Sequence, residues 1–143
     1  MLDTSSLISA LRSAKGASSE VLRLVLKGPL VILMDYKLAS EYRDVALRPE
    51  HLRASGLASG EVVGVIEALE SIAEPVEVLT KSRPLSSDPD DDMVLDVAIN
   101  GNADVIITAN TKHFKTAANR FGIAVLSPSE LLLQLRTQES HAE

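Results

Sequence analysis

The sequence predicts one α/β domain built as three layers (α/β/α), with a mostly parallel sheet between two layers of helices. Short apolar runs rich in β-branched residues alternate with segments whose apolar residues recur at helical spacing. The chain has 143 residues, a usual length for one domain. Strands that alternate with helices form parallel sheets, and a parallel sheet needs helices on both faces. Together these observations predict the α/β class.

Four short runs are expected to form buried strands, because each is apolar, rich in β-branched residues and bounded by helix breakers. They occupy residues 30–34, 76–79, 105–108 and 123–126. In a parallel α/β sheet the active site lies beyond the carboxyl ends of the strands. The residues that follow these runs are therefore the first candidates for chemistry.

Helical patterns fill the intervals between the runs. The stretch 21–26 has a candidate N-cap in Ser18 or Ser19, and Gly28 stands just past its end. Similar apolar stripes follow at residues 38–45 and 62–72.

The C-terminal region carries a helix-start signature. Ser127-Pro128-Ser129-Glu130 has Ser as the N-cap, Pro at the first helical position and Glu three residues after the cap. This capping box predicts a helix over residues 131–135. We place the domain at residues 1–136 and a disordered tail at residues 137–143.

The composition excludes several classes of function. The absence of Cys excludes disulfides, zinc–thiolate sites and cysteine nucleophiles. Two Tyr, two Phe and no Trp are too few for a platform that stacks single-stranded bases. The net charge of −6 argues against a polybasic nucleic-acid binder but not against a nucleic-acid enzyme, because the placement of the acids decides. Neither a phosphate-binding Gly-rich loop nor a Gly-x-Ser-x-Gly elbow is present.

The sequence shows neither a targeting segment nor a membrane span. The first residues lack a basic region followed by an apolar one. The longest uninterrupted apolar run covers residues 30–34, whereas a membrane span needs about 20 apolar residues. We therefore expect a cytoplasmic protein with no membrane partner.

Two candidate site residues lie at predicted strand ends. Asp3 stands at the head of the chain, before a helix that Ser5 or Ser6 can start, and Asn110 directly follows the run 105–109. Both would face the crevice at the edge of the sheet. Asp3 taken alone is equally well explained as a helix cap.

The densest acidic cluster is Asp88-Pro89-Asp90-Asp91-Asp92, which opens a helical pattern. Asp88 can be the N-cap, and acids in a first turn favour the positive end of the helix dipole. Two acids would satisfy that need, and four in five positions repel one another. We therefore expect a hard cation such as Mg²⁺ nearby.

Glu41 is the most informative single residue. It falls about 60° from Leu38 around the predicted helix, on the apolar side. A carboxylate at a buried edge is costly unless it is paired or bound to a metal, and the alternative is a Glu that reaches water or pairs with Arg. His51, His113 and His141 show no ligand spacing, although His113 is near enough to Asn110 to contact a substrate.

Taken in order, these segments resemble the PIN-domain family, and within it the VapC-like ribonuclease toxins of type II toxin–antitoxin systems. The similar segments are LDTSSLISALRSAKGAS, LASEYRDVALRPEH, RPLSSDPDDDMVLDVAINGNADVIITANTKHF and FGIAVLSPSELL. Together they cover nearly the whole chain, and their order and spacing make the resemblance specific.

The resemblance implies a metal-dependent endoribonuclease that hydrolyses RNA phosphodiester bonds with Mg²⁺ or Mn²⁺. The implied catalytic and metal-binding residues are Asp3, Glu41, Asp91 as the third acid with Asp92 as the second choice, and Asn110. We assign Ser5 and Thr108 as hydrogen-bonding neighbours.

Lysines and arginines near these positions are candidates for binding substrate phosphates. We assign this role to Lys112, Lys115 and Arg12, with Lys15 and Arg120 nearby, and a solvated helix face is the alternative for each of them. The resemblance also implies a homodimer and a cognate antitoxin protein that inserts a segment into the acidic crevice.

The sequence departs from the family pattern at two places. Most PIN domains have Asp where Asn110 stands, and the neutral amide takes about one negative charge out of the expected site. Only Met1 and Leu2 precede Asp3, so we expect a clipped first strand or a start that lies upstream. Both departures favour an alternative function, a PIN fold that binds an antitoxin or RNA without cleaving. An acid-cluster phosphohydrolase is a third interpretation, although no second Asp stands two residues after Asp3.

Overall fold

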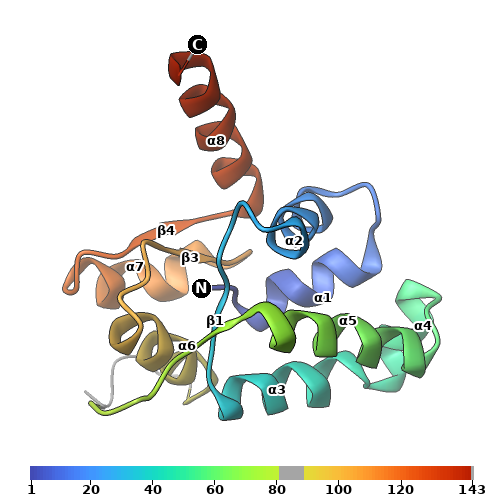
Figure 1. The fold of residues 1–143 in the computed structure, drawn as a ribbon. Helices are drawn as coiled ribbons and strands as arrows, with labels where there is room; N and C mark the ends of the chain where they lie inside the picture. The colour runs from blue at the N-terminus through green and yellow to red at the C-terminus, as the bar shows by residue number, and fades with distance from the viewer. Residues whose placement is uncertain (81–88, 143) are drawn as a thin grey trace.

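The computed structural model describes residues 1–80 and 89–142, which form an α/β fold with short parallel strands (Figure 1). Strand β1 (Leu33–Met34) pairs in parallel with β2 (Glu74–Pro75), and β3 (Val105–Ile107) pairs in parallel with β4 (Ala124–Leu126). Leu2 adds a parallel bridge to Ile107. The predicted fold class is confirmed: all strand pairings within the described ranges are parallel.

Eight helices of the described chain surround these strands. They are α1 (Thr4–Arg12), α2 (Ala17–Lys27), α3 (Tyr36–Ala46), α4 (Pro49–Ser55), α5 (Ser59–Ile72), α6 (Pro89–Asn100), α7 (Thr111–Asn119) and α8 (Pro128–Ala142). In Figure 1, α1, α2 and α5 lie to one side of the strands, and α6 and α7 lie to the other. No helix in residues 1–80 or 89–142 has both the length and the apolar character that crossing a lipid bilayer requires.

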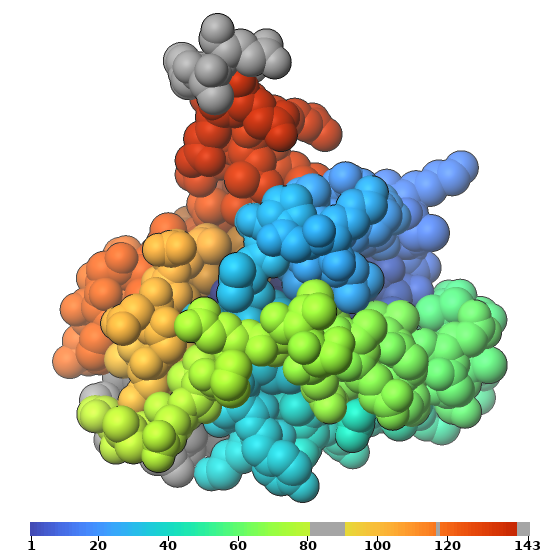
Figure 2. All heavy atoms as spheres, in the orientation of Figure 1, coloured from blue at the N-terminus to red at the C-terminus, as the bar shows by residue number. Residues whose placement is uncertain are grey.

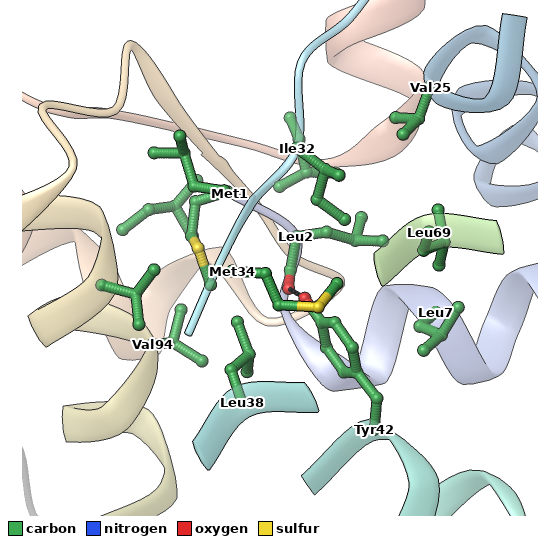
Figure 3. Close-up of a cluster of buried hydrophobic side chains, with 14 of the residues drawn as sticks. Met1, Leu2, Leu7, Val25, Ile32, Met34, Leu38, Tyr42, Leu69 and Val94 are labelled. Carbon is green, nitrogen blue, oxygen red and sulfur yellow. Dashed lines mark hydrogen bonds between the residues drawn. The ribbon is translucent and has the colours of Figure 1, made fainter. Parts of the chain in front are cut away.

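The core forms where the first residues of the chain meet helices α1, α3 and α5. Leu7, Leu38 and Leu69 are completely buried, and Figure 3 shows these side chains gathered around Leu2 and Met34. Burying each such leucine contributes about 1.5–3 kcal/mol relative to leaving it in water. The apolar contacts therefore hold the chain around Leu2 between β3 and α3.

The apolar runs 105–108 and 123–126 do contain strands, at β3 and β4, and the run 30–34 contains β1. The prediction of a strand at 76–79 is wrong. The pairing with β1 involves residues 74–75 and ends at the bond from the Val76 amide to the Met34 carbonyl, because β1 stops there and the chain turns into α3.

The segment after Val76 is held by a side chain instead of by a neighbouring strand. Asn100, at the end of α6, accepts hydrogen bonds at Oδ1 from the amides of Leu79 and Thr80, each at 3.0 Å. Its Nδ2 donates to the carbonyl oxygens of Thr80 and Asp96 at 2.9 and 2.8 Å. Three of these bonds attach the extended segment to α6, and the fourth, to Asp96, lies within the helix.

Helix α2 is capped differently from the prediction at its start and as predicted at its end. Its N-cap is Gly16, which has no side chain to cap with, so the assignment of Ser18 or Ser19 is wrong. Ser19 is buried and donates to the carbonyl oxygens of Ala10 and Ser13, which ties α2 to α1. Gly28 is the C-cap with φ 108°, a left-handed conformation that favours glycine.

The capping box at the start of α8 is confirmed. The Glu130 amide donates to Ser127 Oγ at 3.1 Å, and the Ser127 amide donates to Glu130 Oε1 at 3.0 Å. Hydrogen bonds from Ser127 lower the pKa of the Glu130 carboxyl, and the bond from the Ser127 backbone amide has the larger effect. The helix itself continues to Ala142, well past the predicted boundary at residue 136, and rises from the body of the molecule (Figures 1 and 2).

Gly101 is where α6 approaches β1 and the segment after β2 most closely. A Cβ there would lie 2.8 Å from Val76 Cγ2, 2.9 Å from Leu33 Cδ1 and 3.0 Å from the Val97 carbonyl oxygen. We expect Gly101→Ala to lower the free energy of unfolding by about 1–3 kcal/mol, because a well-packed core resists added atoms. Chemical denaturation measures the change.

Gly64→Ala is the matched control for this substitution. Gly64 lies inside α5, and an added Cβ would meet nothing within 4 Å. Alanine there should raise stability by about 0.5–1 kcal/mol, because it restricts the unfolded chain. Equal effects of the two substitutions would contradict the close approach at Gly101.

Candidate functional site

Asp3 lies at the carboxyl edge of the strands, as the sequence predicts. Its amide donates to the Ile107 carbonyl at 2.9 Å, which extends the bridge made by Leu2. Asp3 is also the N-cap of α1, but its side chain makes no capping hydrogen bond. The interpretation of Asp3 as a helix cap therefore does not account for its side chain. The residue is buried, with 8% of its surface exposed.

Two hydroxyl groups hold the Asp3 carboxylate. Ser5 Oγ donates to Asp3 Oδ2 at 2.8 Å, and the buried Thr108 Oγ1 donates to the same oxygen at 2.9 Å. Thr108 Oγ1 in turn accepts a hydrogen bond from the backbone amide of Asn110 at 3.0 Å. The structure thus joins Asp3, Ser5, Thr108 and Asn110 in one network, in which both described donors to the carboxylate use Oδ2.

Tyr42 holds the residue before Asp3 in place, a role that the sequence does not predict. Its hydroxyl, completely buried, donates to the carbonyl oxygen of Leu2, the residue before Asp3 (Figure 3). Burial raises the pKa of Tyr42 far above its ordinary value, and the negative charges of Asp3 and Asp35 add to that effect. The hydroxyl therefore stays protonated and keeps donating.

Helix α6 carries further acids, and one of them lies near α7. Asp92 is 5% exposed, and Asp91 Oδ2 lies 3.6 Å from His113 Nδ1 on α7. Asp88 lies outside the described residues, and so does the side chain of Asp90. His113 is therefore near the acidic cluster as well as near Asn110.

The remaining predicted residues are half-buried or exposed. Glu41 is half-buried on α3, next to the completely buried Tyr42, in agreement with a place at the edge of the apolar face. Asn110 is exposed at the start of α7. The expected phosphate-binding residues Lys112, Lys115 and Arg12 are all exposed.

Two further acids escaped the sequence analysis. Asp96 is 3% exposed and lies four residues after Asp92, on the same face of α6. Its signal was a single carboxylate inside the apolar stretch 94–98. Asp35 follows β1 directly and caps α3 by accepting from the Leu38 amide at 2.8 Å. Its position directly after a buried apolar run is the signal in the sequence that predicts Asp35.

The donor set suits a hard divalent cation in its chemistry. Asp3, Asp91, Asp92 and Glu41 offer carboxylate oxygens, and the hydroxyl donors orient Asp3 through one oxygen while Oδ1 points elsewhere. Within the described ranges, no three Asp, Glu or His side chains gather closely enough to enclose a metal. Mg²⁺ usually takes only one or two carboxylates and keeps several waters, so the residues fit such an ion.

The described residues form an α/β fold in which Asp3, held by two hydroxyl groups, lies buried beside the end of β3. A family model for the PIN domain matches residues 1–112, most of the chain. The chain belongs to the PIN-domain family, whose members are generally nucleases that use divalent metal ions. No curated protein and no solved structure matches it.

The buried Tyr42 hydroxyl predicts a loss of stability in alkaline solution. The unfolded chain releases this proton near pH 10, whereas the folded chain retains it to higher pH. Above pH 10 the unfolded state therefore binds fewer protons, and the free energy of unfolding falls as the pH rises. The contribution of the Tyr42 hydroxyl to the free energy of unfolding is fully present below pH 10. It decreases by about 1.4 kcal/mol by pH 11.

Denaturant unfolding of wild type and Tyr42→Phe at several pH values from 8 to 11 measures this effect. The Phe variant lacks the bond to Leu2 throughout, so wild type should be the more stable protein at pH 8. The difference should shrink as the pH approaches 11. Tyr36→Phe alters an exposed tyrosine, and its difference from wild type should stay constant. A constant difference for Tyr42→Phe would refute the assignment.

Proposed function

We propose that this PIN domain is a metal-dependent endoribonuclease that hydrolyses RNA phosphodiester bonds. The observation that carries the proposal is the Asp3 carboxylate, buried at the carboxyl edge of the strands and oriented by Ser5 and Thr108. A buried carboxylate held through one oxygen is a prepared ligand, because orienting it costs nothing more when a cation arrives.

Of the candidate ligands Asp3, Asp91, Asp92 and Glu41, one or two would contact Mg²⁺ or Mn²⁺ directly, and the others would hold its waters. The bound ion supplies an activated water and stabilises negative charge on the phosphate. Ser5 and Thr108 keep the Asp3 oxygen in place, and His113 sits beside Asp91. Asn110 contributes a neutral amide at the position where most relatives carry Asp, which favours one tightly held ion over two.

The exposed cations Lys112, Lys115 and Arg12 would bind phosphates of the RNA backbone. Such contacts give affinity without sequence specificity, and each displaced counterion makes binding weaker at higher salt. Neutralisation of the carboxylates by the metal lets an acidic site accept a polyanion.

In its biological role we propose a VapC-like toxin of a type II toxin–antitoxin pair. The support is the resemblance of the four segments named above, from the Asp3 motif to the capping box at Ser127. The proposal includes a homodimer, a cytoplasmic location and a cognate antitoxin that binds the acidic crevice.

A second candidate is a PIN module that binds an antitoxin or RNA without cleaving. Asn110 favours it, since an exposed amide in place of a carboxylate weakens metal binding. Calorimetry with Mn²⁺ separates the two candidates. Absent metal binding, together with tight association to a small partner protein, would favour the binding module.

Replacement of the site acids by amides tests the proposed activity. We expect Asp3→Asn and Asp91→Asn to lower Mg²⁺- or Mn²⁺-dependent RNA cleavage at least about 100-fold, because each removes a ligand charge while keeping the shape. Cleavage of a labelled single-stranded RNA over time is the measurement.

Asp44→Asn provides the matched control on α3. Asp44 is exposed and pairs at 3.1 Å with Arg48, the N-cap of α4, so its loss should leave cleavage unchanged. Equal cleavage by all four proteins would refute the assignment. Loss of cleavage in the Asp44 variant would point instead to a general sensitivity to charge.

Thr108→Val tests whether the hydroxyl positions Asp3. The substitution keeps the buried volume but removes the donor to Asp3 Oδ2 and the acceptor for the Asn110 amide. We expect Mn²⁺ affinity to fall about 10- to 100-fold, as for other groups that orient a ligand. Thr137→Val, on the exposed surface of α8, should bind Mn²⁺ like wild type. Unchanged affinity in Thr108→Val would show that the network does not prepare the ligand.

A further inference from the structure

A cavity of about 320 Å³ opens between the start of α3, the extended segment after β2 and the middle of α6. Its volume lies at the lower end of the range for small-molecule pockets, about 300–1,000 Å³. Tyr36 and Lys37 contribute one wall, Val76 and Val78 a second, and Met93 a third. In Figure 2 the yellow-green segment after β2 and the cyan start of α3 lie at the same end of the molecule.

Tyr36 is the most exposed large apolar side chain of the described residues, at 87%. It is the first residue of α3, directly after Asp35, so its ring stands at the mouth of the cavity without a packing role in the core. Aromatic rings in this setting stack on planar ligands, and every nucleobase offers a flat face.

The lining combines an apolar floor with acceptors. Val76, Val78 and Met93 provide apolar surface, and three carboxylates, those of Asp35, Glu77 and Asp96, also line the cavity. Carboxylates only accept hydrogen bonds, so they suit the exocyclic amino groups of cytosine, adenine and guanine. Uracil presents carbonyl oxygens at the corresponding positions, which carboxylates repel.

The cavity adjoins the candidate metal site. Met93 follows the candidate ligands Asp91 and Asp92 on α6, and Asp96 of the same helix also lines the cavity. An RNA strand bound at Asp3 could therefore place a neighbouring base here.

We propose that this cavity receives one nucleobase of the RNA substrate and prefers bases with an exocyclic amino group (cytosine, adenine and guanine) over uracil. Tyr36 stacks on the base, and Lys37 contacts an adjacent phosphate. The inference rests on the proposed RNA substrate and adds to it a source of sequence preference. Asn100 keeps the wall in place through its bonds to Leu79 and Thr80.

NMR of the full chain with ¹³C-labelled tyrosine rings tests the proposal, because the sequence contains only two tyrosines, Tyr36 and Tyr42. The probes are the tetranucleotides rC4, rA4 and rU4, added with Mg²⁺ to the Asp3→Asn variant, so that the metal still neutralises the acidic site while little cleavage occurs. We expect rC4 and rA4 to shift the Tyr36 ring signals and to bind at least about tenfold more tightly than rU4. The signals of the buried Tyr42 should stay in place.

Two substitutions at one position separate stacking from folding. Tyr36→Leu should lower rC4 affinity about 5- to 100-fold, whereas Tyr36→Phe, which keeps the ring, should bind like wild type. Both change a surface position, and circular dichroism checks that the fold is retained. Equal affinities of Tyr36→Leu and wild type would overturn the proposal, as would unmoved Tyr36 signals or equal binding of rU4.

RNA cleavage with Mn²⁺, measured in parallel, distinguishes the two proposals. Cleavage without any shift at Tyr36 would refute the base pocket and leave the nuclease proposal intact. Shifts at Tyr36 without cleavage would support the pocket and refute the nuclease. Absence of both would refute both.

Discussion

The burial of the Asp3 carboxylate is the constraint on which the rest of the site depends. A charged group removed from water is costly unless hydrogen bonds replace its hydration. Ser5 and Thr108 supply those bonds, and both can do so only if the chain before Asp3 lies against β3. The bridge from Leu2 to Ile107 fixes one side of that chain, and the Tyr42 hydroxyl fixes the other.

This constraint explains why the site lies on the rigid part of the molecule. Leu2 is surrounded by fully buried side chains of α1, α3 and α5, so Asp3 inherits its position from the core. Helix α6 approaches from the other side and brings Asp91 and Asp92, while Gly101 and Asn100 at its end hold it against β1 and the segment after β2. Ligand positions set by packed elements are more reproducible than positions set by loops.

The sequence predicts those features whose causes are local. The capping box at Ser127 and the glycine at Gly28 depend on a few neighbouring residues, and both are confirmed. The prediction of a strand at 76–79 was wrong, because strand pairing there depends on where β1 ends, about 40 residues earlier in the chain. Ser19 has cap chemistry, but its hydroxyl bonds the turn between α1 and α2, which no local pattern encodes.

The same distinction applies to the site. Asp3 and Asn110 could be predicted because polar residues after buried runs are rare and informative. Tyr42 could not, because the sequence shows only an apolar position on a helix and says nothing of the carbonyl that its hydroxyl meets. Asp96 lies between these cases: its burial follows from the apolar stretch around it, whereas its place next to Asp92 requires the helix.

The acid excess of the chain acquires a different meaning once its acids are placed. A phosphate responds mainly to charges within about 8–10 Å at physiological salt, so the net charge of −6 matters less than the charges at the site. Asp3, Asp92 and Asp96 are nearly fully buried, whereas Lys112 and Lys115 are exposed on α7. The lysines are thus in contact with solvent, whereas these carboxylates are largely shielded from it. Net charge alone does not decide against RNA.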